Sequence, residues 1–261
     1  MSDAVADPRP VSGAEADPLK KPDAAVIAPR PTRRYRAAAF QVYVMVASIV
    51  FVVLALGAHV VPYFPIDLTI TRAVQGYQGP IFDGLMHGIS WLGFFPQVAA
   101  LSAVVILALF FFGLKWEAVS TLFATISSGV GALVKLVVVR PRPSADLIRV
   151  FRELPSSGFP SGHVLSTTAF CGFLVFLCFT LPKPSPGRTA LLVALSLLIA
   201  LMGPSRIYLG QHWFSDVMGA YLFGSLWLAL TIRFYRWGKT RYFVHQPVAP
   251  AAPATSEVGT A

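Results

Sequence analysis

The stretch KLVVVRPRPSADLIRVFRELPSSGFPSGH, residues 135–163, places a group of cations between two long apolar runs. Apolar runs of about 20 residues are typical of membrane-spanning helices, where an unpaired charge is costly. Cations gathered at such a boundary therefore indicate a bound anion. The cations of this stretch are Lys135, Arg140, Arg142, Arg149 and Arg152.

The first end of this stretch predicts a helix that stops beside its own cations. Pro141 and Pro143 cannot continue a helix that contains Lys135. Lys135 on the last helical turns and Arg142 just beyond them can therefore face one point at the membrane surface.

The second end, PSGH at residues 160–163, predicts the start of the next helix. Proline near a first helical position, followed by Ser161 and Gly162, leaves backbone N–H groups free to bind an anion. The helix dipole favours negative charge at the same place. Both ends therefore indicate a phosphate cradle.

A second stretch, SRIYLGQHWFSD at residues 205–216, supplies an imidazole and a carboxylate. If the chain is helical there, His212 and Asp216 share a face, because they are four residues apart. The carboxylate can then accept the proton of one imidazole nitrogen while the other nitrogen stays free. This arrangement indicates an oriented nucleophile or base. Asp216 is also the only acidic residue inside the helices that we predict.

These residues resemble the three motifs of the type 2 phosphatidic acid phosphatase superfamily, K-x6-R-P, P-S-G-H and S-R-x5-H-x3-D. All three are intact and in order, and the resemblance covers about residues 117–235. It implies that His212 attacks phosphorus to give a phosphohistidine and that Asp216 orients it. It also implies that His163 protonates the leaving group and later activates water. The phosphate-binding residues that the motifs supply are Lys135, Arg142, Ser161, Gly162 and Arg206.

The composition excludes an ordinary soluble fold. The chain has 261 residues, of which 55% are hydrophobic and 13% are charged, as in a polytopic membrane protein. The formal net charge of +9 does not indicate nucleic-acid binding, because most basic residues flank apolar runs.

We predict an all-α fold, a six-transmembrane helix bundle with short interfacial helices in the first outer loop. That loop is residues 62–91, and a turn at residues 115–117 joins the second and third spans. The predicted spans are about residues 37–61, 92–114, 118–139, from the PSGH element to 181, 189–203 and 213–237. Residues 1–36 and 238–261 are predicted to be disordered cytoplasmic tails around one membrane phosphatase domain, residues 37–237.

The basic residues predict the orientation of the spans. Six spans place both tails on one side, where basic residues accumulate, and the positive-inside tendency assigns that side to the cytoplasm. Apart from Arg72, the cations on the other side lie in or beside the three motifs. We therefore expect a multi-pass protein of the plasma membrane with its active site on the periplasmic or extracellular face.

Neither a metal site nor a disulfide is expected. The histidines show no H-x-x-x-H pattern, no cysteine pair has ligand spacing, and Cys171 and Cys178 are too far apart along one helix to be joined. We predict metal-independent chemistry without a cofactor, and the oligomeric state is left open.

Other polar and aromatic residues receive ordinary interpretations. Arg140, Arg149 and Arg152 are interpreted as solvated loop residues in preference to ligands of a second phosphate. His87 is interpreted as a surface residue, and Tyr208 and Trp213 as anchors at the membrane interface.

The function predicted from these features is hydrolysis of a lipid phosphomonoester or diphosphate. A lipid phosphate can enter sideways with its tails still in the bilayer, and the sequence does not choose among phosphatidate, lysophosphatidate, phosphatidylglycerol phosphate and undecaprenyl diphosphate. A membrane phosphotransferase that uses an alcohol acceptor is the alternative. Vanadium-dependent haloperoxidases resemble the same motifs but are soluble, and a transporter would carry its polar residues at the bilayer midplane.

Overall fold

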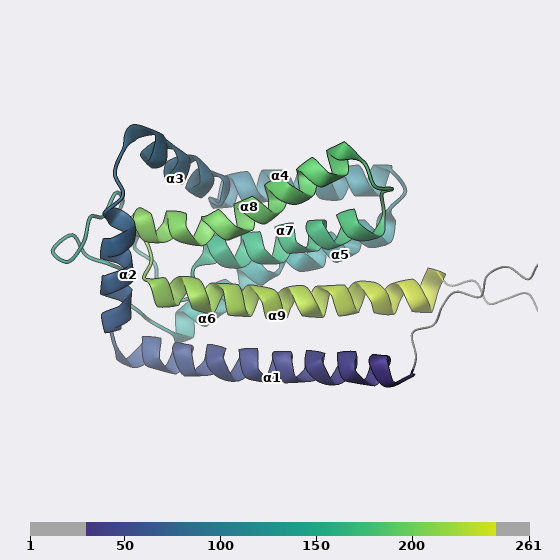
Figure 1. Cartoon of the computed structure of the whole chain (residues 1–261), viewed down its shortest axis with the longest axis horizontal. Coiled ribbons are helices and arrows are strands. Elements are labelled where there is room, and N and C mark those ends of the chain that lie inside the picture. Colours follow the sequence, from purple (N-terminus) through teal and green to yellow (C-terminus); the bar gives the residue numbers. More distant parts are fainter. Residues whose placement is uncertain (1–29, 244–261) are drawn as a thin grey trace, which may run out of the picture. The chain divides into compact units, whose positions relative to one another are not determined.

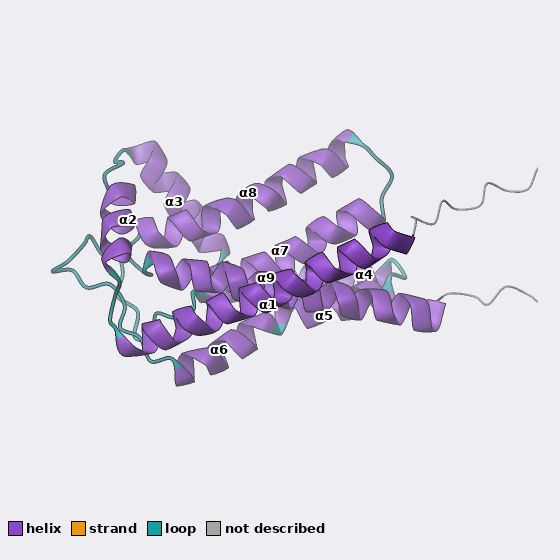
Figure 2. Ribbon diagram, turned by 60° about the horizontal axis from the view of Figure 1, so that its bottom comes forward, coloured by secondary structure: helices purple, strands orange, loops and turns teal. Residues whose placement is uncertain are grey.

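The computed structural model describes residues 30–243, which form α-helices, one short π-helical turn and loops, with no strand in that range (Figure 2). The predicted all-α fold is confirmed. The helices are α1 (Arg30–Val60), α2 (Pro65–Gln75), α3 (Pro80–Leu92), α4 (Phe95–Phe111), α5 (Lys115–Thr125), α6 (Ser127–Val137), α7 (Gly162–Thr180), α8 (Pro186–Tyr208), α9 (Phe214–Gly238) and the π-helical turn η1 (Lys239–Phe243).

Five helical segments in this range are long and apolar enough to cross a membrane, and a bent pair makes a sixth. The pair is α3 and α4, which meet at 60°. The five segments are Ala37–Val60, Lys115–Val137, Gly162–Thr180, Pro186–Tyr208 and Phe214–Tyr242. The structure therefore has five candidate spans, or six when the bent pair is counted as one span, where six were predicted.

The first predicted loop contains the two short helices α2 and α3, as expected. Figure 1 shows α2 lying across the ends of α8 and α9, with which it is in contact. The second span differs from its predicted bounds, because α4 begins at Phe95 and a turn at Gly93 separates it from α3.

The predicted turn at residues 115–117 is wrong, since these residues form the first turn of α5. The chain turns instead at Gly113, whose φ of 79° suits a residue without a Cβ atom. Glu117 is consequently a buried helical residue with 1% exposure. Asp216 is therefore not the only acid within the helices.

The third span is also interrupted, whereas we predicted one continuous helix. It breaks at Ile126, between α5 and α6. Ser120 and Ser127, two of its small residues, are fully buried, which fits close helix packing.

Helix α7 lies in the interior of the bundle, in contact with α5, α6, α8 and α9 (Figure 1). Its membrane segment is 61% buried, against 28% for the segments of α8 and α9. Gly224 of α9 packs against Thr168 of α7, where an added Cβ would lie 2.8 Å from the Thr168 Cβ. The first residues of α7 are therefore held at a fixed place between its neighbours.

The fifth span is longer than predicted. Helix α8 continues past Gly203 and through Pro204 to Tyr208, so Arg206 lies on its last turn. Gly210, with a φ of 65°, then turns the chain toward α9. An added Cβ at Gly210 would collide with the backbone carbonyl of Arg149.

The helix ends that carry the three motifs come together at one end of the bundle. They are the last turns of α6 and α8 and the first turns of α7 and α9, together with residues 138–161, which form no helix. This long segment is tied to its surroundings by backbone hydrogen bonds, among them Phe151 N–H to Leu209 O at 3.2 Å. The opposite helix ends hold Lys115, Lys183, Arg188, Arg236 and Lys239.

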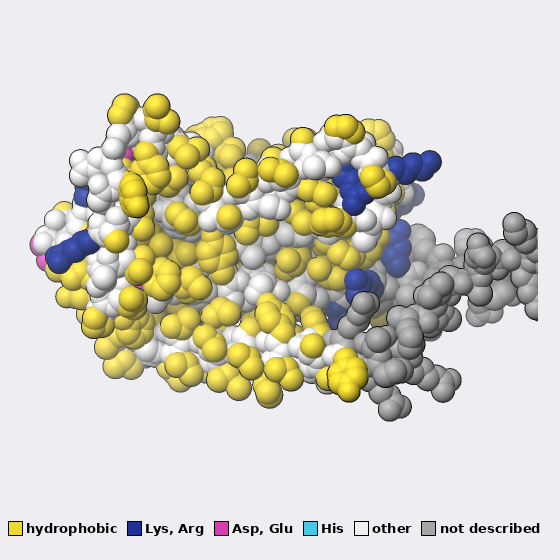
Figure 3. All heavy atoms as spheres, in the orientation of Figure 1, with side chains coloured by type: hydrophobic (Ala, Val, Ile, Leu, Met, Phe, Trp, Pro, Cys, Tyr) yellow, Lys and Arg dark blue, Asp and Glu magenta, His cyan; other side chains and the backbone are white. Residues whose placement is uncertain are grey.

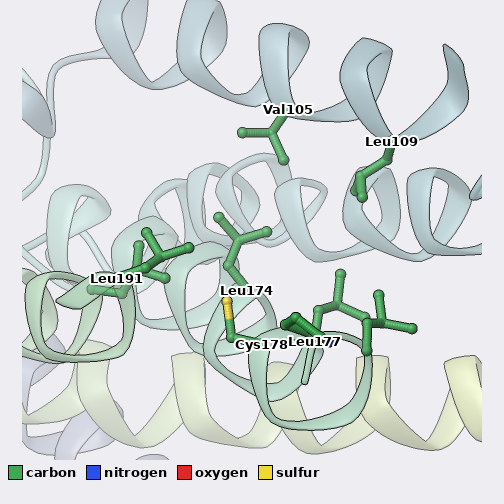
Figure 4. A pocket seen from close by; sticks show the side chains of 9 residues that line it. Val105, Leu109, Leu174, Leu177, Cys178 and Leu191 are labelled. Atoms are coloured by element: carbon green, nitrogen blue, oxygen red, sulfur yellow. The ribbon is translucent and has the colours of Figure 1, made fainter. Parts of the chain in front are cut away.

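On the face seen in Figure 3, apolar side chains cover much of the helices, and many Lys and Arg side chains lie toward the helix ends. An apolar cavity of about 270 Å³ lies among α4, α7 and α8. Figure 4 shows Val105, Leu109, Leu174, Leu177, Cys178 and Leu191 on its walls. It has no group that could bind a phosphate, and it lies toward the end of α7 remote from the motifs. Cys171 and Cys178 are both free thiols, as expected.

The two predicted tails fall mainly outside the described residues, namely 1–29 and 244–261. Residues 30–36 of the first tail are helical, and residues 239–243 of the second form the π-helical turn.

Candidate active site

Three cations of the motifs lie on different elements, and two of them are held largely by backbone carbonyls. Lys135 Nζ, on the last turns of α6, donates to Ser157 O at 2.7 Å. Arg142, in the segment after α6, donates through Nε to Ser156 O at 2.7 Å and through Nη1 to Gln211 O at 2.5 Å. Backbone carbonyls therefore fix the positions of the Lys135 and Arg142 side chains but do not neutralise their positive charges.

Arg206 is the most deeply buried of the three cations. Its exposure is 0%, and Nη1 donates to Ser90 Oγ of α3. Its Nε and Nη2 atoms are buried and have no hydrogen-bond partner among the described residues. Buried donors without acceptors are costly, so these two nitrogens indicate a ligand that accepts hydrogen bonds.

The start of α7 contributes two more polar atoms of the same kind. Ser161 Oγ and His163 Nε2 are buried without a partner in the described part of the chain. The His163 ring stands edge-on to Phe94, with centroids 4.8 Å apart. His163 interacts electrostatically with Arg206 and His212. The structure thus brings the predicted residues of α7 to the cations of α6 and α8, and Gly162, the first residue of α7, lies between the two.

His212 lies in the loop before α9, so the helical argument for its pairing with Asp216 is wrong. The two side chains are nevertheless close, with Nδ1 3.6 Å from Asp216 Oδ2. The Nδ1 atom is 2.8 Å from Gly158 O. A carbonyl oxygen only accepts, so the imidazole proton is on Nδ1 and donates to Gly158.

The other imidazole nitrogen of His212 faces the cations. Arg142 Nη1 lies 3.1 Å from Nε2 and donates to it. Burial, and then the positive charges of Arg142 and Lys135, hold the pKa of His212 well below its ordinary value of 6.5. His212 is therefore neutral, with the lone pair of Nε2 directed toward the phosphate-binding side.

Arg140 is the residue that the sequence analysis misjudged most. It is not solvated: its exposure is 1%, and its guanidinium forms ion pairs with Asp67 at 2.9 Å and Asp216 at 2.5 Å. The motif offered a weak signal, since Arg140 repeats the Arg-Pro step of Arg142. Nothing in the sequence showed that a carboxylate of the first loop would meet it.

Of the other interpretations of polar and aromatic residues, some are confirmed and some are wrong. His87 is exposed, as predicted. Arg149 and Arg152 are exposed too and lie over aromatic rings, Arg149 at 4.7 Å from the Phe151 centroid. Tyr208 and Trp213 are not interface anchors, because both are buried. Tyr208 donates to Asp83, and Trp213 packs on Tyr63 with centroids 5.2 Å apart.

No group of three His, Cys, Asp or Glu side chains in residues 30–243 is placed to hold a metal ion. The charge that faces a bound anion comes from Lys135, Arg142 and Arg206. The arrangement is suited to binding a tetrahedral oxyanion next to a neutral imidazole.

The chain is similar to known proteins in sequence. Residues 113–239 match the PAP2 superfamily, the type 2 phosphatidic acid phosphatases. The chain is 30% identical over 181 residues to phosphatidylglycerophosphatase B of Bacillus subtilis, covering 67% of this chain and 86% of that protein.

Two solved structures are similar to this one. The crystal structure of a transmembrane PAP2-type phosphatidylglycerolphosphate phosphatase from Bacillus subtilis aligns with a TM-score of 0.66 and 25% identity, over 77% of this chain and 98% of that chain. The crystal structure of Aquifex aeolicus LpxE aligns with a TM-score of 0.54 and 22% identity, over 66% and 98%. The second likeness concerns the fold alone.

Proposed function

Since the chain belongs to the PAP2 superfamily of membrane lipid phosphate phosphatases, we propose that it hydrolyses the terminal phosphate of a lipid phosphomonoester or diphosphate through a phosphohistidine. The protein is a multi-pass integral membrane protein. The observation that carries the proposal is the set of buried polar atoms on Arg206, Ser161 and His163 that have no hydrogen-bond partner within residues 30–243.

The proposed phosphate site uses donors from α6, α7, α8 and the segment between α6 and α7. Lys135, Arg142 and Arg206 neutralise the phosphate oxygens, and Ser161 with the Gly162 N–H completes the cradle at the start of α7. These donors are fixed before the substrate binds, so they need little reorganisation as charge moves onto the oxygens.

In the first step, Arg142 Nη1 transfers its hydrogen bond from His212 Nε2 to a phosphate oxygen, and the freed lone pair of Nε2 forms a bond to phosphorus while the bond from phosphorus to the leaving oxygen breaks. His163 gives its proton to that oxygen, which leaves as a lipid alcohol from a phosphomonoester or as a lipid monophosphate from a diphosphate. In the second step His163 takes a proton from water, the water oxygen attacks phosphorus, and the bond to Nε2 breaks to release inorganic phosphate. The carbonyl of Gly158 and the carboxylate of Asp216 support the positive charge that develops on the ring, since both lie next to Nδ1.

The proposed orientation places the site on the periplasmic or extracellular face of the plasma membrane, with both tails in the cytoplasm. The positive-inside tendency supports it, because Lys115, Lys183, Arg188, Arg236 and Lys239 lie at the opposite helix ends. A lipid headgroup could then reach the site from the outer leaflet.

The substrate class follows from this position and from the relatives. The name of the Bacillus subtilis relative makes phosphatidylglycerol phosphate one candidate, and phosphatidate, lysophosphatidate and undecaprenyl diphosphate share the same reacting group. Positively charged side chains supply the charge stabilisation that a metal ion supplies in other phosphatases, so we expect turnover to be independent of metal ions.

The test is phosphate release by the purified protein in detergent from each of these four lipids, with a chelator present. We expect release from at least one lipid, and inhibition by orthovanadate. Loss of all activity on chelation would contradict the metal-free mechanism. A labelled alcohol acceptor that captures the phosphoryl group in place of water would favour the phosphotransferase alternative.

A further inference from the structure

A chain of buried charges links the first loop to the carboxylate beside His212. Arg140 lies at its centre, between Asp67 of α2 and Asp216 of α9, and each carboxylate has 0% exposure. Ser215 closes the group, since its Oγ accepts from Arg140 Nη1 at 2.7 Å and donates to Asp67 Oδ2 at 2.8 Å.

Every nitrogen of the Arg140 guanidinium has an acceptor within the protein. Nε donates to Pro62 O at 3.1 Å, Nη1 to Ser215 and Asp216, and Nη2 to Asp67. Arg206, by contrast, has two nitrogens without a partner in residues 30–243. Four of the five N–H groups of the Arg140 guanidinium thus donate within the protein, and its charge is paired with two carboxylates, so Arg140 is held by the protein and not by a phosphate.

Arg140 holds both groups that face His212 Nδ1. Its side chain binds Asp216 Oδ1, which leaves Oδ2 toward the imidazole and the Trp213 N–H. Its backbone carbonyl accepts from Gly158 N–H at 2.8 Å, and the carbonyl of Gly158 accepts the Nδ1 proton.

Asp67 in turn holds Arg140 and joins three segments. Its carboxylate accepts from the Phe64 N–H at 2.9 Å, from the Ser215 N–H at 2.7 Å and from Arg140. With two carboxylates around one guanidinium, the group keeps a net negative charge next to Nδ1. Without Asp67, the charge of Arg140 would cancel that of Asp216.

We propose that Arg140 and Asp67 are positioning residues for the reaction, which fix the acceptors of His212 and keep the field beside its Nδ1 atom negative. A ring that becomes positive on attacking phosphorus is stabilised by that field. The inference rests on the proposed function, and it assigns helix α2 of the first loop a part in the chemistry that the three motifs do not contain.

The other charged groups that face His212 come from several elements and are cations. The group formed by Asp67, Arg140 and Asp216 differs from them because its net charge is negative. Arg142, Lys135 and Arg206 approach from the segment after α6, from α6 and from α8, and His163 approaches from α7. Arg142, Lys135 and Arg206 are cations. Asp216 is the acid in contact with the ring among the described residues.

Two substitutions separate charge from geometry. Asp67→Asn keeps the shape of the side chain and removes one negative charge. The imidazolium form of His212 is then less stable, so the acid limb of the kcat/KM profile moves to lower pH. We expect kcat to fall about tenfold, as for outer partners of reacting groups.

Arg140→Lys keeps the charge but cannot reach three acceptors at once. We expect kcat to fall about 10–100-fold with the acid limb where it is in the unaltered protein. Neither residue touches the phosphate, so the inhibition constant of orthovanadate should stay within about twofold of that of the unaltered protein in both variants. Retained vanadate inhibition also shows that the site is folded.

Glu117→Gln is the matched control, because Glu117 is a buried carboxylate paired with Lys239 at the other end of the helices. It should leave kcat and the acid limb unchanged. The same substrate is used throughout, so the ionisation of the substrate cancels in the comparison.

The outcomes distinguish this inference from the proposed function. An unaltered protein that releases phosphate from no lipid overturns both. An active protein whose Asp67→Asn and Arg140→Lys variants have unchanged kcat and acid limb overturns the positioning inference alone. If the inhibition by vanadate weakens by the same factor as kcat in these variants, the two residues have only a structural role, and the positioning inference is overturned as well.

Discussion

Two buried charges, Glu117 and Arg206, lie at opposite ends of the helical bundle and are held in different ways. At the end remote from the motifs, Glu117 is paired with Lys239 at 2.6 Å and accepts from Tyr235 Oη at 3.1 Å. At the motif end, Arg206 is equally buried but has two nitrogens without a partner among residues 30–243. A charge within a membrane protein is costly unless it is paired or has a function. The comparison shows that Arg206, and not Glu117, keeps hydrogen-bonding groups for a ligand.

The largest predicted effect is the loss of turnover when the nucleophile at the motif end is removed. His212→Ala removes the nucleophile. We expect kcat to fall at least about 10,000-fold, as it does in other enzymes when one member of a group of interdependent catalytic residues is removed. Phosphate release from the preferred lipid measures it. Turnover near that of the unaltered protein would remove His212 as the nucleophile.

The next effect tests the unpaired donors directly. Arg206→Lys keeps the charge but loses the planar fork, so two oxygens can no longer be bound together. We expect a loss of about 100–1,000-fold in kcat/KM and weaker inhibition by orthovanadate. If vanadate inhibits the variant as strongly as the unaltered protein, the free nitrogens of Arg206 do not bind the oxyanion.

A smaller effect concerns the ionisation of His212. Its pKa is lowered by burial and by the neighbouring cations, so the neutral, attacking form persists as the pH falls through 6.5, and protonation begins only below that value. An NMR titration of histidine-labelled protein in detergent, with the His212→Asn variant to assign the signal, measures this. A midpoint at or above 6.5 would contradict the described electrostatics.

The smallest effect on activity is expected at the remote end. Glu117→Gln removes one partner of a buried ion pair, and we expect a loss of about 1–3 kcal/mol in the free energy of unfolding. Turnover should not change, because the site is at the other ends of the same helices. Thermal unfolding and phosphate release, measured on the same sample, test both statements. Reduced turnover at full folding would weaken the contrast between the ends.

Much of the fold followed from patterns that are local in sequence. Apolar runs predicted the spans, and the short helices of the first loop followed from its mixed composition. Hydropathy does not register backbone breaks, so the interruption at Ile126 and the helical start of α5 at Lys115 were missed. The sharp turn at Gly113 shows that a glycine conformation, and not the nearby charges, decided where the chain reverses.

The site was predictable to the extent that its residues lie in three short motifs. The pairing of Arg140 with Asp67 was not, because the two are 73 residues apart and meet only when α2 lies across the ends of α8 and α9. The acceptor of the His212 proton was missed for a similar reason. It is the backbone carbonyl of Gly158, which has no signature in the side-chain sequence.

The central claim is that His212 transiently carries the phosphoryl group at the motif end. Rapid quenching at alkaline pH during turnover of a lipid labelled in its terminal phosphate, followed by mass spectrometry of the peptides, tests it most directly. The account predicts phosphorylation of His212, absent from the His212→Ala variant. Turnover with no labelled histidine, or with the label on another residue, would contradict it.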